Sequence, residues 1–123
     1  MAVTEDRTGY LNKITWTWTS TSAGAYSAAT TYQYNGIINE LVTVPAGGGD
    51  APTTLYDITI TDATSVDVLN GLGADRSATA QEAKHKSDGL GNVKSSALTL
   101  NVTNAGDIKQ GTVYLWIYDT DKL

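Results

Sequence analysis

The chain has 123 residues and a net charge of −5, so a single domain with one hydrophobic core is the simplest expectation. Eight lysines and arginines against 13 acidic residues argue against a nucleic-acid or anionic-membrane partner, because both require clustered positive charge. The sequence has no cysteine, which excludes disulfides and thiolate metal sites, and no apolar run approaches the length of a membrane-spanning helix.

The N-terminal part of the chain predicts a loose segment followed by a strand. Residues 1–12 are mostly polar, so we expect a flexible N-terminal arm, and they lack the apolar run of a signal peptide, so we expect synthesis in the cytoplasm. In residues 12–20, Ile14, Trp16 and Trp18 alternate with threonines, which is the period of a half-buried strand. Both tryptophans lie on the apolar face, where core packing is the expected role. The ten residues that follow are small and polar and indicate a loop or a weak edge strand.

A β-hairpin is predicted next. The dipeptide Asn35-Gly36 lies between two strand-like runs and tolerates the positive φ angles of a type I′ turn. The second arm would run from Ile37 to Val44 and end at Pro45, which cannot donate a hydrogen bond to a sheet. Residues 46–53 are rich in glycine and are expected to form a flexible connector.

The second half of the chain predicts further strands around one unusual segment. Residues 55–62 and 96–103 each alternate apolar and polar side chains, and residues 66–71 suggest a short return strand. Residues 71–95 carry much of the charge and little that could fill a core, so we expect a long polar loop or arm. With six to eight short strands and turns between them, residues 1–123 predict a single all-β domain, an antiparallel β-sandwich or a jelly-roll-like small barrel.

The last predicted strand is apolar on both faces. One face carries the aliphatic residues Val113, Leu115 and Ile117 and suits the core. The other carries Tyr114, Trp116 and Tyr118, for which three roles compete. They could be covered by the 71–95 segment, form a protein–protein interface, or form a platform for sugar rings. Interface or loop cover ranks first, because no cluster of acidic and amide groups stands beside the aromatic residues to bind sugar hydroxyls.

Catalytic and metal-binding patterns are weak. The one histidine, His85, lies between two lysines and is expected to be a solvated loop residue, and the sequence has no nucleophile-elbow motif. Asp57, Asp62 and Asp67 follow one another at five-residue spacing and form a weak candidate Ca²⁺ site, although aspartates commonly stabilise turns. We therefore expect no enzymatic activity and no cofactor.

Four segments of the chain share a recurring pattern with a known group of proteins. The segments are Gly36–Pro45, Ala51–Asp62, Asp67–Arg76 and Leu98–Gly111. They resemble the small virion structural proteins of tailed bacteriophages and prophages, and the resemblance extends over most of residues 34–118.

The resemblance implies a non-enzymatic role in the virion, most simply as a capsid decoration or cement protein on the head. The implied partners are the major capsid protein and copies of the chain itself, with a trimer favoured, through Tyr114, Trp116 and Tyr118. Proteins of the neck, tail or fibres are the alternative placement. A carbohydrate-binding module is the alternative function, using the same aromatic residues or another set, Tyr26, Tyr32 and Tyr34.

Overall fold

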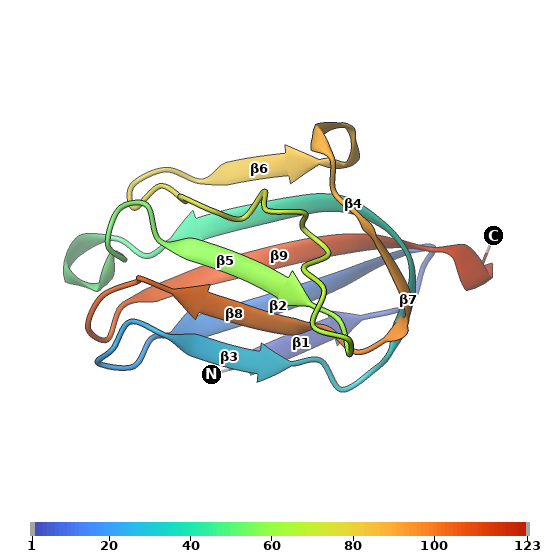
Figure 1. Cartoon of the computed structure of the whole chain (residues 1–123), viewed down its shortest axis with the longest axis horizontal. Helices are drawn as coiled ribbons and strands as arrows, with labels where there is room; N and C mark the ends of the chain where they lie inside the picture. Colours follow the sequence, from blue (N-terminus) through green and yellow to red (C-terminus); the bar gives the residue numbers. More distant parts are fainter. Residues whose placement is uncertain (1, 123) are drawn as a thin grey trace.

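The computed structural model describes residues 2–122 and consists of two antiparallel β-sheets, with no α-helix in these residues (Figure 1). The larger sheet has six strands in the order β1-β2-β9-β4-β6, with β7 also paired to β4, and the smaller sheet has the order β3-β8-β5. This confirms the predicted all-β fold. Within residues 2–122, no helix is long and apolar enough to cross a membrane.

The bounds of the elements are as follows. The larger sheet contains β1 (Ala2–Asp6), β2 (Leu11–Thr19), β4 (Tyr34–Pro45), β6 (Glu82–His85), β7 (Asn92–Ser96) and β9 (Gln110–Asp119). The smaller sheet contains β3 (Tyr26–Ala29), β5 (Asp57–Thr61) and β8 (Thr99–Thr103). Three short 3-10 turns are η1 (Gly48–Asp50), η2 (Lys86–Asp88) and η3 (Thr120–Lys122).

The core lies between the two sheets and confirms the predicted alternation. Trp16 and Trp18 of β2 are fully buried, and the Trp18 ring lies 5.6 Å from the ring of Tyr56, between centroids. The Trp16 Nε1–H donates a hydrogen bond of 3.1 Å to the carbonyl of Ala28, which ties the larger sheet to β3 of the smaller one. The apolar faces of β5, β8 and β9 contribute Ile58, Ile60, Leu100, Val102, Val113, Leu115 and Ile117 to this core.

The N-terminal segment differs from the predicted flexible arm. Residues 2–6 form β1 along the edge of β2, whereas residue 1 lies outside the described part of the chain. The Glu5 carboxylate accepts hydrogen bonds from the N–H groups of Thr31 and Tyr32 and from the hydroxyl of Tyr34, at 2.9, 3.2 and 2.8 Å. These partners are distant in sequence, so nothing local in the first residues indicates that the segment is held.

Residues 71–95 also differ from the predicted polar loop. They contain β6 and most of β7, which pair with successive parts of β4 and extend the larger sheet (Figure 1). The chain before them runs beside β5 without forming a regular return strand: Val68 N–H donates to the Ile60 carbonyl at 2.8 Å, and Ile58 N–H to the Gly73 carbonyl at 2.9 Å. The polar composition is thus explained by a position at the sheet edges.

The predicted turn at Asn35-Gly36 is wrong, because β4 passes through both residues as one strand. Gly36 pairs with Val93 of β7 on one side and with Asp119 of β9 on the other. A Cβ atom at Gly36 would collide with the backbone carbonyl of Tyr118. The glycine is therefore required by a close approach of two strands, and a turn signal and a packing signal look identical in the sequence.

We expect Gly36→Ala to lower the free energy of unfolding by about 3 kcal/mol, because the strands must separate to admit a methyl group. Urea denaturation measures this change. Gly47→Ala is the matched control: a Cβ there meets nothing within 4 Å, and its effect should be below about 0.5 kcal/mol. Equal stability of the two variants would contradict the close approach.

Candidate functional site

Strand β9 directs its three aromatic residues away from the core. Its inward-facing residues are fully buried, whereas Tyr114 and Trp116 are half-buried and Tyr118 is 43% exposed. β9 pairs with β2 on one side and β4 on the other, so it is the middle strand of the path β1-β2-β9-β4-β6 (Figure 1). The aromatic residues therefore stand at the centre of the sheet's outer side.

The strand register extends this aromatic stripe into a broader surface. Residues directly opposite each other in an antiparallel pair project to the same side of a sheet, so each aromatic residue has one neighbour on β2 and one on β4. We call this surface the outer face. Its three central rows are Leu11–Tyr118–Ile37, Lys13–Trp116–Glu40 and Thr15–Tyr114–Val42.

Charged side chains stand on both sides of the aromatic stripe. The Lys13 ammonium lies 4.8 Å from the ring centroid of Tyr114 and 5.4 Å from that of Trp116, within the range of a cation–π contact. The centroids of the two rings are 5.8 Å apart. On the other side, a Glu40 carboxylate oxygen lies 3.5 Å from Nε2 of His85. Each charge belongs to the row centred on Trp116.

The Trp116 row continues onto the outermost strands. Asp6 of β1 is opposite Lys13, and His85 of β6 is opposite Glu40. Hydrogen bonds from Thr8 lower the pKa of the Asp6 carboxyl, and the nearby Lys13 charge lowers it further, so Asp6 is an anion at neutral pH. His85, predicted to be a solvated loop residue, is exposed but lies at the end of a strand.

The segment 71–95 does not lie over the aromatic residues. Its strand β6 continues the sheet beyond β4, and the paired residues Val42 and Ala83 extend the Tyr114 row. The segment thus widens the outer face, and the interpretation of Tyr114, Trp116 and Tyr118 as a surface beneath this loop is wrong.

The second set of tyrosines considered for sugar binding does not form an exposed platform. Tyr34 is 2% exposed, and burial together with the Glu5 hydrogen bond raises the pKa of its hydroxyl. Tyr32 is exposed, but the Arg7 guanidinium lies 4.4 Å from its ring centroid. Tyr26 lies on the smaller sheet and packs against the core.

The three aspartates of the candidate Ca²⁺ site are engaged separately. No group of three or more metal-ligating side chains gathers anywhere in residues 2–122. Asp57 and Asp62 accept hydrogen bonds from loop residues near each of them. Asp67 accepts three bonds from backbone N–H groups, those of Ile60, Leu69 and Gly71 at 3.1, 3.1 and 3.0 Å. Asp62 and Asp67 stabilise turns, which is the ordinary role of aspartate in loops, and Asp57 ties β5 to two loops that are distant in sequence.

We expect Asp67→Ala to lower the free energy of unfolding by about 2 kcal/mol, because three backbone donors lose a charged acceptor. The loss should be the same with excess Ca²⁺ and with EDTA, as measured by thermal denaturation. Asp50→Ala, in an exposed position, removes the same charge and should change stability by less than about 0.5 kcal/mol. A Ca²⁺-dependent rise in the melting temperature of the wild-type protein, lost in Asp67→Ala, would contradict this assignment.

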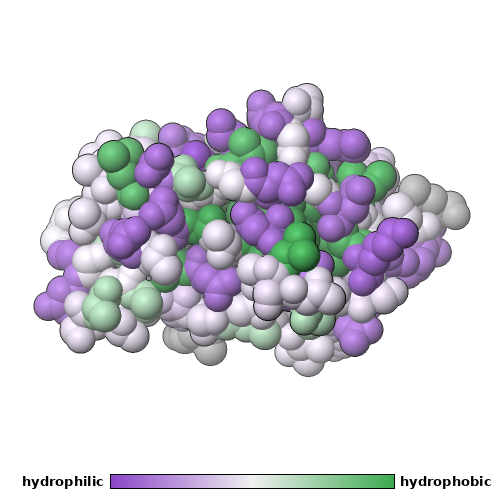
Figure 2. Space-filling model, in the orientation of Figure 1, coloured by the Kyte–Doolittle hydropathy of each residue, from purple (hydrophilic) through white to green (hydrophobic). Residues whose placement is uncertain are grey.

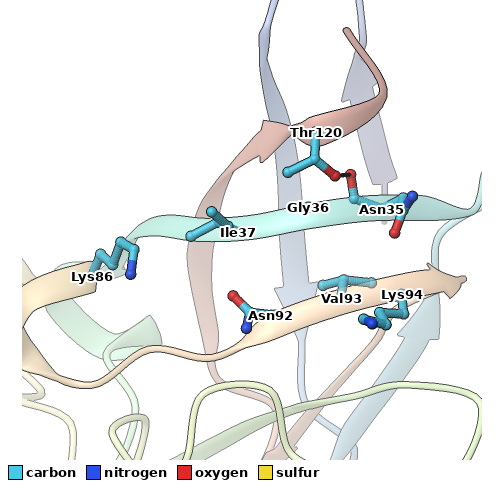
Figure 3. Close-up of a pocket in the computed structure, with 8 residues that line it drawn as sticks. All are labelled: Asn35, Gly36, Ile37, Lys86, Asn92, Val93, Lys94 and Thr120. Carbon is cyan, nitrogen blue, oxygen red and sulfur yellow. Dashed lines mark hydrogen bonds between the residues drawn. The ribbon is translucent and has the colours of Figure 1, made fainter. Parts of the chain in front are cut away.

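A pocket of about 310 Å³ lies where β4, β7 and η3 meet (Figure 3). Two lysines, Lys86 and Lys94, line it together with amide, hydroxyl and aliphatic groups, and the Thr120 hydroxyl donates to the Asn35 carbonyl. No carboxylate or imidazole lies among the lining residues to form an acid–base pair with the lysines. The outer face is therefore the stronger candidate for function.

The smaller sheet presents a different surface. Figure 2 shows this side of the molecule, on which hydrophobic residues appear as separate areas among hydrophilic ones.

No protein-family model, curated protein or solved structure matches the chain. Function is therefore inferred from the outer face and from the sequence pattern.

Proposed function

We propose that the chain is a non-enzymatic structural protein of a bacteriophage virion, most simply a capsid decoration protein on the head, that acts through protein–protein contacts. The observation that carries the proposal is the outer face, where Tyr114, Trp116 and Tyr118 occupy the middle strand of the larger sheet and remain partly exposed to solvent. The sequence resemblance to small virion proteins supports the same role.

The composition of the outer face suits a protein partner. Tyrosine and tryptophan are enriched in interfaces because they bring a large contact area together with a polar group, and a central anchor in a ring of less critical residues is typical. Here Trp116 is central, Leu11 and Ile37 add apolar area, and charged residues lie on both sides. The Lys13 ammonium is already close to the Tyr114 and Trp116 rings, which disfavours stacking of a sugar on that side of them.

Binding would stabilise the head by linkage. A protein that binds the assembled lattice and not its separate subunits stabilises the lattice by the free energy of binding at each occupied site. Repeated copies that also contact each other gain avidity, because each bound copy raises the effective concentration of its neighbour. No catalytic group is needed for this role.

Trp116→Ala tests the proposal in a co-sedimentation assay with heads that lack the protein. We expect the affinity for heads to fall by at least about 30-fold, the effect of losing a central aromatic anchor. The free energy of unfolding should fall by only about 1 kcal/mol, because the side chain lies outside the core. Tyr32→Ala, which removes an exposed aromatic residue elsewhere, should bind like the wild-type protein.

Three outcomes would contradict the proposal. The first is wild-type affinity of Trp116→Ala for heads, and the second is a wild-type protein that binds neither heads nor tails. The third is binding to a bacterial polysaccharide that Trp116→Ala abolishes, which would identify a carbohydrate-binding module. Binding to tails alone would keep a virion role and exclude the head position.

A further inference from the structure

We infer that the outer face packs against the outer face of a second copy of the chain, about a two-fold axis nearly parallel to β9. The inference rests on the proposed function, in which the outer face is a protein interface, and it identifies the partner on this face as a second copy, so that Trp116 supports head binding through the avidity of the pair. It follows from the order of charges that the strand register places across the larger sheet.

In the row through Trp116, residues at equal distances on the two sides of the tryptophan have opposite charges. From β1 to β6 it consists of Asp6, Lys13, Trp116, Glu40 and His85. Lys13 and Glu40 lie one strand to either side of the tryptophan and have opposite charges. Asp6 and His85 lie two strands away, and they are an anion and a group that can become a cation. A second copy of this row, placed against the first in reversed order, therefore brings opposite charges face to face.

A two-fold axis parallel to β9 produces this reversal. It places β9 of one copy on β9 of the other, and it exchanges the two sides of the sheet, so that β2 faces β4. Lys13 of each copy then faces Glu40 of the other, and Trp116 meets Trp116. An axis perpendicular to the strands through Trp116 would instead place Lys13 on Lys13. The charges therefore favour the axis along β9.

The same two-fold rotation also places the residues of the two flanking rows against each other. In the Tyr118 row, Leu11 of one copy would face Ile37 of the other, an apolar pair on each side of the two tyrosines. In the Tyr114 row, Thr15 of one copy would face Val42 of the other, and Val42 is already buried in the single chain. Leu11 and Tyr118 are 40% and 43% exposed in the single chain, and this packing would cover both.

The natural twist of β-sheets is compatible with these pairs. Stacked sheets cross at about 30°, which a two-fold axis inclined about 15° to β9 produces. Neighbouring strands are about 4.8 Å apart, so the side chains one strand from β9 are displaced only slightly by this rotation. Lys13 and Glu40 thus remain within reach of their partners, because both have long side chains.

Reciprocal charge reversal tests the arrangement by sedimentation equilibrium and light scattering. We expect the wild-type protein to dimerise, and Lys13→Glu or Glu40→Lys alone to weaken dimerisation by more than about tenfold, because each places two like-charged pairs in the interface. The double variant Lys13→Glu/Glu40→Lys restores both pairs, and its dimerisation constant should return to within about threefold of the wild-type value. Lys94→Glu, an exposed charge reversal on β7 outside the three central rows, should leave dimerisation unchanged.

A wild-type protein that stays monomeric at 100 µM, on the order of the weakest specific contacts, would overturn the inference. A dimer that the single reversals leave intact would also overturn it. So would a double variant that fails to dimerise although its melting temperature matches that of the single variants. A trimer that responds to none of these variants would also overturn the inference.

Head binding is measured separately. A monomer that binds heads refutes the two-fold pairing alone, whereas a dimer that binds no virion component refutes the proposed function alone.

Discussion

Strand β9 has apolar side chains on both faces, and the larger sheet is assembled around it. Its inner face supplies Val113, Leu115 and Ile117 to the core, while its backbone pairs with β2 and β4 along most of its length. No alternative register could exchange these faces without cost, because a slip of one residue would bury the aromatic side and expose the aliphatic one. The position of Tyr114, Trp116 and Tyr118 is therefore fixed by the same pairing that builds the core.

An exposed aromatic surface at the centre of a sheet has a physical cost. It exposes apolar area to water and favours association of the chain with other molecules. Charged residues beside the stripe limit that association to partners with complementary charges, since an unmatched Lys13 or Glu40 would lose its water without gaining a partner. The outer face thus combines a general attraction, which comes from the rings, with a requirement for a specific arrangement of charges.

The local patterns of the sequence predict the strands that form the core and fail at the sheet edges. The alternation in β2, β5, β8 and β9 reflects burial of one face, which is a local property and is readable. β1, β6 and β7 are short and polar, and they are held by partners far along the chain, such as the Glu5 carboxylate that binds the loop before β4. The prediction of a turn at Gly36 failed for the same cause, because the glycine is required by the close approach of β9, a strand distant in sequence.

The candidate site shows the same division. The sequence identified the three aromatic residues because their strand is apolar on both faces, a signal visible in six consecutive positions. It did not identify Leu11, Lys13, Ile37, Glu40 or Val42 as their neighbours, since only the pairing register brings these residues together. The charge order along the Trp116 row depends on four separate strand pairings, and no local pattern encodes it.

The central claim is that the outer face is an interface, and hydroxyl-radical footprinting of individual side chains tests it most directly. The protein would be oxidised when dilute, when concentrated and when bound to heads, with Tyr32 as an exposed reference at 49% accessibility. The account predicts that Trp116 and Tyr118 become protected on concentration or on head binding while Tyr32 does not. If the oxidation rate of Tyr118 relative to that of Tyr32 were the same under all three conditions, the account would be contradicted.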